Sequence, residues 1–112
     1  MTLSSQRGFP LRGEIYDVYL DPVVGAETGK RRPALVVSRD ENNNFAGTVT
    51  VVPITSQPAK KHYPFEVLVH KGTGGLTRDS RIKTNQVRTI DKRRLVVRRG
   101  ALPASYVAEV EK

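Results

Sequence analysis

The residues of this chain that could do chemistry are cations and hydroxyls at the ends of its strand-like runs. Arg32 stands directly before Pro33 at the start of one apolar run, and Thr55 closes another. Proline fixes its own φ and pushes the preceding residue toward an extended conformation, so Arg32 should leave the backbone in a defined direction. A guanidinium held in this way is suited to gripping a phosphate group. Further basic and polar side chains flank this pair or lie in neighbouring segments: Lys30, Arg31, Ser56, Lys60, Lys61, Gln86 and Arg88.

Each of these side chains also has a purely structural interpretation. Thr55 could cap a turn, Gln86 could satisfy backbone groups, and Arg88 could pair with Asp91. The sequence has no spacing typical of a metal site, because His62 and His70 are its only histidines and it has no cysteine. We therefore expect neither a metal ion nor a cofactor.

Net charge is the strongest global feature of the chain. It has 19 Lys and Arg against 11 Asp and Glu, a formal charge of +8. The segment 78–99 contains nine of the basic residues and only two acidic ones, Asp79 and Asp91, so it carries +7 of the +8. Such a concentrated excess favours a polyanionic partner, nucleic acid or an acidic protein, over uniform solubilisation.

Length and composition indicate one globular domain over residues 1–112, with 1–11 as a flexible lead-in. No apolar run approaches the roughly 20 residues needed to span a bilayer. The N-terminal residues 1–9 lack the apolar segment of a secretory signal. We therefore expect a cytoplasmic protein without a membrane partner.

Runs rich in β-branched and aromatic residues predict short strands at 13–20, 34–38, 48–55, 64–70, 80–88 and 95–97. Pro53 cannot donate to a ladder, so the pairing of its strand should be interrupted there. The sequence also predicts a turn at 40–47, one helical turn at 89–94 and a short terminal helix after Pro103. The predicted fold is all-β with small helical additions, a bent sheet or small barrel that could bring the strand ends together at one rim.

Several motifs follow one another in an order that resembles a known family. They are RGEIY at 12–16, LDP at 20–22, GAE at 25–27, RRPALVV at 31–37, VVPIT at 51–55, GLTRDS at 75–80 and NQVRTIDKRRL at 85–95. Together they resemble the MazF/PemK-type toxin endoribonucleases of type II toxin–antitoxin systems.

This resemblance implies an SH3-like barrel of the MazF/PemK/CcdB type with a short C-terminal helix, assembled as a homodimer. It implies metal-independent, sequence-specific cleavage of single-stranded RNA by 2′-OH attack, which leaves a 2′,3′-cyclic phosphate and a 5′-OH. An acidic cognate antitoxin would be the protein partner. DNA would be bound only together with that antitoxin, at its own operator.

The resemblance also implies roles for single residues. The family's arginine before a proline acts in acid–base chemistry, and a threonine assists it; these map onto Arg32 and Thr55. Arginine is a poor base because its pKa lies above about 12, so charge stabilisation and proton donation suit Arg32, and a hydrogen bond to phosphate suits Thr55. Glu27 is the nearest candidate base, and His62 is a weaker one. RNA contacts would come from Lys30, Arg31, Ser56, Lys60, Lys61, Gln86 and Arg88.

The chain departs from the family pattern at Asn85, where relatives commonly have Asp, so a role that needs a carboxylate there is in doubt. Two other functions remain open. A related fold serves toxins that poison DNA gyrase by binding alone, and fold does not separate the two classes. A non-catalytic RNA-binding barrel would fit the charge but would leave the Arg32-Pro33 pair unexplained.

Overall fold

The structure is a computed structural model that describes residues 8–21, 25, 30–57 and 63–112. Its strands are β1 (Glu14–Tyr19), β2 (Arg31–Val36), β3 (Thr48–Thr55), β4 (Glu66–Val69), β5 (Ser80–Lys83), β6 (Arg88–Asp91) and β7 (Leu95–Ala101). The other described elements are two short helices, α1 (Asp40–Phe45) and α2 (Ala104–Val110), and the 3₁₀ turns η1 (Thr84–Gln86) and η2 (Lys92–Arg94). None of the described helices is long and apolar enough to cross a membrane.

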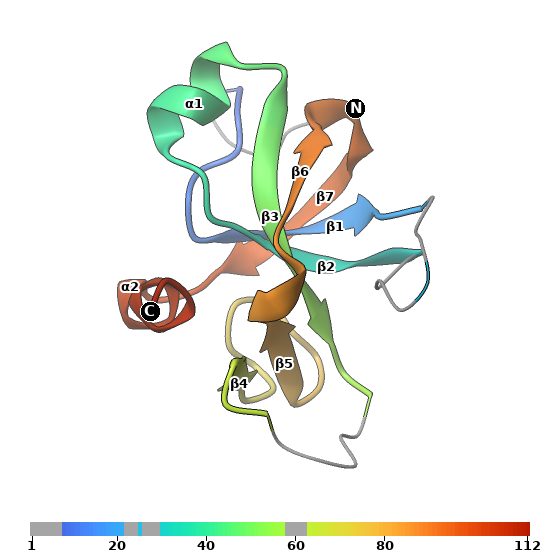
Figure 1. Ribbon diagram of the computed structural model, residues 1–112, viewed down its shortest axis with the longest axis vertical. Coiled ribbons are helices and arrows are strands. Elements are labelled where there is room, and N and C mark those ends of the chain that lie inside the picture. Colours follow the sequence, from blue (N-terminus) through green and yellow to red (C-terminus); the bar gives the residue numbers. More distant parts are fainter. Residues whose placement is uncertain (1–7, 22–24, 26–29, 58–62) are drawn as a thin grey trace.

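The strands form one antiparallel sheet in the order β4-β5-β3-β2-β1-β7, with β6 pairing the first half of β3 (Figure 1). On the side of β3 away from β2, the partner is β6 over residues 48–51 and then β5 from Ile54 onward. This change of partner falls at Pro53, which has no N–H to donate to a ladder. The predicted interruption at Pro53 is therefore confirmed, as is the all-β fold with a short C-terminal helix.

The bent sheet buries apolar side chains on both faces, because neighbouring residues of a strand point to opposite sides. One core contains Ile15, Leu35, Val52, Ile54, Val69, Leu76, Ile82, Leu102 and, from α2, Val110. The other contains Tyr16, Val18, Leu20, Ala34, Val36, Val49, Val51, Ile90 and Leu95. Both faces of the β1–β2–β3 layer are thus closed by apolar packing, which leaves the strand ends for polar residues.

Some predicted elements differ in kind or extent. The predicted turn at 40–47 is wrong in kind, because α1 begins there and its buried Asn43 donates a hydrogen bond to the carbonyl of Ser38 (3.0 Å). The predicted strand at 95–97 is too short, since β7 pairs along β1 as far as Ala101. The predicted helical turn at 89–94 is confined to η2, because β6 continues to Asp91.

The flexible lead-in was predicted over 1–11, and residues 1–7 lie outside the described part of the chain. Residues 8–11 are attached to the domain: Pro10 is buried, and the N–H of Leu11 donates to the Glu14 carboxylate (2.6 Å).

Gly75 fixes the position of the loop between β4 and β5 against β7. Its φ is +80°, and a Cβ at this position would lie 2.0 Å from the carbonyl oxygen of Arg99. Only a glycine allows both this backbone conformation and this approach. The close contact brings the following residues, Leu76 to Ser80, over one face of the sheet and so builds one wall of the site.

Candidate active site

Arg32 and Thr55 lie at the adjoining ends of the paired strands β2 and β3. The paired residues of these two strands run from Val36 opposite Val51 to Ala34 opposite Pro53. The pairing ends there, and Arg32 and Thr55 each lie two residues further along their strand, so the alternation of side chains puts both on the face that Ala34 and Pro53 share. Arg32 also pairs with Val18 of β1, which places it at the rim of the second core. The two predicted catalytic residues thus lie at adjoining strand ends on the same face, although only Arg32 lines the cavity described below.

The Thr55 side chain is held in a defined hydrogen-bonding state. Thr55 is only 6% exposed, and its Oγ1 accepts a hydrogen bond from the N–H of Gln57 (3.3 Å). A hydroxyl that accepts in this way keeps its own proton for another acceptor. The Thr55 hydroxyl can therefore donate to a phosphate oxygen at the end of β3.

Arg81 supports this arrangement from the neighbouring strand. It lies opposite Thr55 in the β3–β5 register. Its guanidinium donates to the carbonyl of Gln57 (2.9 Å) and to the carboxylate of Glu66 (2.7 Å). The Arg81 and Glu66 side chains are 17% and 3% exposed, so this is a buried ion pair beside the segment that follows Thr55.

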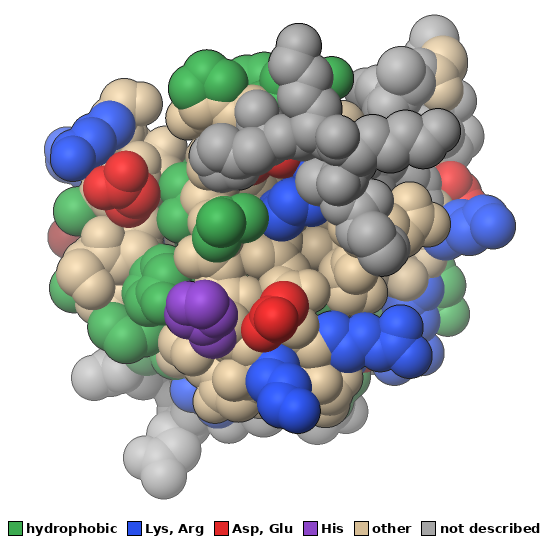
Figure 2. Space-filling view, turned by 90° about the horizontal axis from the view of Figure 1, so that it is seen from below, with side chains coloured by type: hydrophobic (Ala, Val, Ile, Leu, Met, Phe, Trp, Pro, Cys, Tyr) green, Lys and Arg blue, Asp and Glu red, His purple; other side chains and the backbone are tan. Residues whose placement is uncertain are grey.

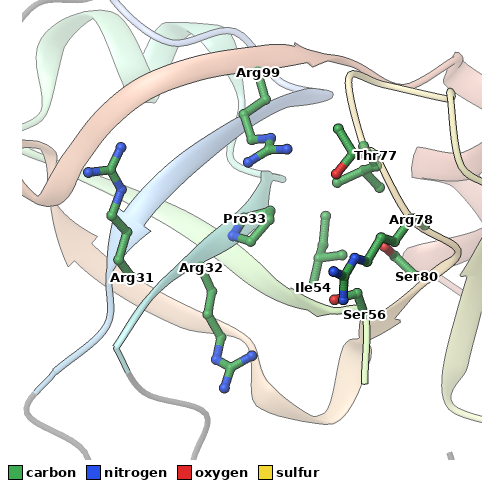
Figure 3. A pocket seen from close by; sticks show the side chains of 10 residues that line it. Arg31, Arg32, Pro33, Ile54, Ser56, Thr77, Arg78, Ser80 and Arg99 are labelled. Atoms are coloured by element: carbon green, nitrogen blue, oxygen red, sulfur yellow. The ribbon is translucent and has the colours of Figure 1, made fainter. Parts of the chain in front are cut away.

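A cavity of about 270 Å³ opens beside Arg32, at the ends of β2 and β3 (Figure 3). Its lining contains four arginines and three hydroxyl side chains, with apolar residues completing the wall: Arg31, Arg32, Arg78, Arg99, Ser56, Thr77, Ser80, Pro33, Ile54 and Leu76. Arg31 and Arg32 point to opposite sides of β2. The cavity therefore presents cations and hydroxyls together, a combination that suits an anionic ligand.

Sequence reasoning named Arg31, Arg32 and Ser56 in this cavity and missed its other polar members. Arg78 and Arg99 were visible only as the two ends of the basic segment 78–99. The charge pattern in the sequence did not distinguish them from the basic residues between them, because their location depends on the packing of the β4–β5 loop against β7.

Gln86 and Arg88 lie on the other side of β3, away from β2. Arg88 is paired with Val51, and its guanidinium donates to the carbonyl of Leu20, so it holds the end of β1. Gln86 lines a separate hollow with Tyr63 and Phe65, whose rings stack at 5.1 Å between centroids. The predicted contacts of Gln86 and Arg88 with RNA stay predictions, and these two residues do not line the cavity beside Arg32.

Several arginines of the basic segment 78–99 are engaged within the protein. Arg94 donates to the carbonyls of Tyr19 and Asp21, and Arg98 pairs with Glu14. Arg93 donates its side chain and its backbone N–H to Asp91, and these hydrogen bonds lower the pKa of the Asp91 carboxyl to about 2. The alternative pairing of Arg88 with Asp91 is therefore wrong, since Asp91 pairs with Arg93.

Figure 2 views the molecule from the end that carries β4 and β5, and it shows Lys and Arg side chains spread around this face. Hydrophobic side chains interrupt the basic ones toward one edge. Positive charge at this end is thus distributed among acidic and apolar neighbours and does not form one continuous patch in this view.

Four of the residues singled out in the sequence, Glu27, Lys60, Lys61 and His62, lie outside the described residues. Lys30 is described: its side chain is exposed, its φ is +65°, and its N–H donates to the Asp21 carboxylate (2.9 Å). This hydrogen bond joins Asp21 and Lys30, the described residues on either side of the segment 22–29 that contains Glu27. Among the described residues, no group of three or more His, Asp or Glu could hold a metal ion.

Comparison with known proteins assigns the family. Residues 11–112 match the model of the PemK-like, MazF-like toxins of type II toxin–antitoxin systems. The chain is 43% identical over 105 residues to the endoribonuclease MazF9 of Mycobacterium tuberculosis, covering 89% of this chain and 88% of that protein.

Two solved structures from Deinococcus radiodurans show the same fold. MazF superposes with a TM-score of 0.80 at 33% identity, over 92% of this chain and 90% of that one. A structure of MazE-MazF superposes with a TM-score of 0.72 at 31% identity, over 92% and 88%. With its family model matched over almost the whole length, this chain belongs to the PemK-like, MazF-like toxins of type II toxin–antitoxin systems.

Proposed function

We propose that this chain is a sequence-specific endoribonuclease that cleaves single-stranded RNA as the toxin of a type II toxin–antitoxin system. The observation that carries the proposal is the placement of Arg32 and Thr55 at the adjoining ends of the paired strands β2 and β3, on the same face by alternation. The similarity to MazF9 and to Bacillus subtilis EndoA, both named endoribonucleases, supports the same activity.

The proposed reaction uses the substrate's own 2′-OH as the nucleophile. Its oxygen forms a bond to phosphorus while the bond from phosphorus to the 5′-oxygen breaks, which leaves a 2′,3′-cyclic phosphate and a 5′-OH. The proton of the 2′-OH passes to a base, for which Glu27 is the candidate, and the departing 5′-oxygen takes a proton from an acid. Arg32 stabilises the charge that develops on the phosphate and can supply that proton, and Thr55 donates to a phosphate oxygen.

The proposed protein partner is an acidic antitoxin. The support is the net charge of +8 and the match to a structure solved as MazE-MazF. A segment that folds on binding could place carboxylates over the basic cavity. Homodimer formation and a cytoplasmic location remain proposals that rest on the family.

The gyrase-binding alternative is not supported, because the matching relatives are named endoribonucleases. A non-catalytic RNA-binding barrel is disfavoured on the same ground.

The test is cleavage of RNA by the purified protein, with sequencing of the new 5′ ends. Cleavage should persist in excess EDTA, give 5′-OH ends, and stop when the sugar at the cut is 2′-deoxy. Arg32→Ala should abolish cleavage, whereas Arg93→Ala, which removes an arginine bound to Asp91, should not. Cleavage that requires Mg²⁺, or an Arg32→Ala variant as active as the parent, would contradict the mechanism.

A further inference from the structure

Two of the arginines that line the cavity beside Arg32 have no role in the proposed reaction: Arg31 and Arg99. Arg31 reaches it from β2 and Arg99 from β7, on the side of β2 opposite the Arg32 side chain (Figure 3). Ser56, directly after Thr55, also lines it. At the rim of the sheet, β2 thus contributes both Arg31 and Arg32 to this cavity, and Ser56 enters it from the end of β3.

Asp17 of β1 organises the two arginines. Its carboxylate receives Arg99 on one oxygen (3.2 Å) and Arg31 on the other (3.5 Å), and its side chain is 13% exposed. The register explains this geometry, because Asp17 lies opposite Pro33 on β2 and Val97 on β7, each two residues from the arginine concerned. Each guanidinium has five N–H donors, so these contacts leave most of them available to a ligand.

The charge of the cavity calls for an anion. Apart from Arg32, three arginines line it, and the single carboxylate of Asp17 is shared by two of them, Arg31 and Arg99. Arg78 and the hydroxyls of Ser56 and Thr77 are exposed and add further donors. Because Arg31, Arg78 and Arg99 come from three places in the fold, β2, the β4–β5 loop and β7, an anion in the cavity is attracted by all three at once.

The volume of the cavity and the side chains that line it indicate which kind of anion can bind. The volume of about 270 Å³ is slightly below the roughly 300–1,000 Å³ of pockets for drug-sized ligands. None of the described residues that line it is aromatic, so it lacks the aromatic platform on which bases commonly stack. The arginine and hydroxyl side chains of the lining therefore suit the phosphate part of a nucleotide better than its base.

We propose that Arg31 and Arg99, oriented by Asp17, form a second phosphate subsite that holds a non-scissile backbone phosphate of the RNA substrate. This inference rests on the proposed function. A single strand that crosses the ends of β2 and β3 can place its scissile phosphate against Arg32 and Thr55 and another phosphate in the cavity. The subsite anchors the RNA and sets which bond reaches the catalytic pair.

The test uses an oligonucleotide of the cleaved sequence with a 2′-deoxy sugar at the cut, in which one linkage at a time is a neutral methylphosphonate. Binding is measured by fluorescence anisotropy for the parent and for Arg31→Gln with Arg99→Gln. Neutralising one particular non-scissile linkage should weaken binding to the parent severalfold and leave binding to the double variant unchanged. The slope of log Kd against log salt should fall by about 0.7, the value for one phosphate contact on a single strand.

Arg12→Gln with Arg93→Gln is the matched control, because both arginines pair with acidic residues away from the cavity. It removes the same charge and should keep the parent's slope and linkage dependence. Circular dichroism of both double variants checks that they are folded.

The outcomes separate this inference from the proposed function. If the protein cleaves RNA, but each methylphosphonate linkage weakens binding equally in the parent and in the Arg31→Gln/Arg99→Gln variant, the subsite is wrong and the proposed nuclease function is unaffected. Sequence-specific binding without cleavage would overturn the nuclease, and the linkage profile would still decide the subsite. If the protein does not bind RNA, the RNA subsite is wrong. Titration with inorganic phosphate, followed by the Nε–H signals of Arg31 and Arg99, then shows whether the cavity takes a free anion instead.

Discussion

Arg81 on β5 lies directly opposite Thr55 on β3, and its guanidinium binds the carbonyl of the residue whose N–H binds the Thr55 hydroxyl. Gln57 is therefore the link between a buried ion pair and a predicted catalytic side chain. Glu66, the other member of that ion pair, has one carboxylate oxygen that is buried without a described hydrogen-bond partner. Arg81 compensates the negative charge of this carboxylate and also binds Gln57, which binds Thr55. We therefore expect that loss of the ion pair displaces Thr55.

Replacing Arg81 should lower kcat because it displaces the Thr55 hydroxyl. We expect Arg81→Met to reduce kcat by about tenfold, because a misplaced hydrogen-bond donor loses part of its transition-state stabilisation. In a Thr55→Ala background, the same substitution should cause no further loss of kcat. Equal losses of kcat in both backgrounds would show that Arg81 acts independently of Thr55.

Stability serves as the companion measurement for Arg81. Removing one partner of a buried ion pair costs about 3–5 kcal/mol, so urea unfolding should show a clear loss for Arg81→Met. Adding Glu66→Gln removes the uncompensated carboxylate and should restore part of the stability without restoring kcat.

The hydroxyl of Thr55 can be tested separately from its shape. Thr55→Val keeps the branched side chain but cannot donate to phosphate, and we expect kcat to fall by about 100-fold or more, the scale seen when a transition-state donor is removed. Thr55→Ser keeps the hydroxyl and should retain most of the activity. Single-turnover cleavage at saturating RNA measures both variants, and a Val variant as active as Ser would exclude a hydrogen-bonding role.

Gly75 should be the least replaceable of the described glycines in loops. Gly75→Ala places a Cβ 2.0 Å from the carbonyl oxygen of Arg99 at a φ of +80°, so the loop must leave β7 and the cavity wall must move. Gly72→Ala has a similar φ of +89° but meets nothing within 4 Å, and should cost only the backbone strain of about 1–2 kcal/mol. Gly47 has no positive φ and a Cβ there would meet nothing within 4 Å, so Gly47→Ala should leave the stability nearly unchanged. Urea unfolding of the three variants should rank them in this order.

Asp91 supplies a prediction for low pH. Its pKa in the folded protein is lowered from 3.8 to about 2 by hydrogen bonds from Arg93, so its contribution to stability is present above the unfolded pKa and is lost as the pH falls through the folded one. Asp91→Asn should therefore be less stable than the parent at pH 6, and the difference should shrink between about pH 4 and pH 2. A constant difference in unfolding free energy across this range would show that the charge of Asp91 is not involved.

Local sequence determined much of this protein. Runs of β-branched residues identify the strands, because their side chains suit a half-buried pleated surface. Pro53 marks the change of partner along β3, since a missing N–H has the same consequence in any sheet. The Arg32-Pro33 pair and Thr55 were recognisable as site candidates because their chemistry and their place at strand ends are local properties, and the ordered motifs identified the family.

The tertiary structure decided which charges are available for a ligand. Arg93, Arg98 and Arg99 look alike in the basic segment, yet the first binds Asp91, the second Glu14 and the third Asp17. Two of these carboxylates lie on β1, more than 80 residues earlier in the chain, and only the pairing of β1 with β7 brings them within reach. Sequence shows how much charge a segment carries, but the partner of each charge follows from strand register and loop packing, which are set by contacts distant in the chain.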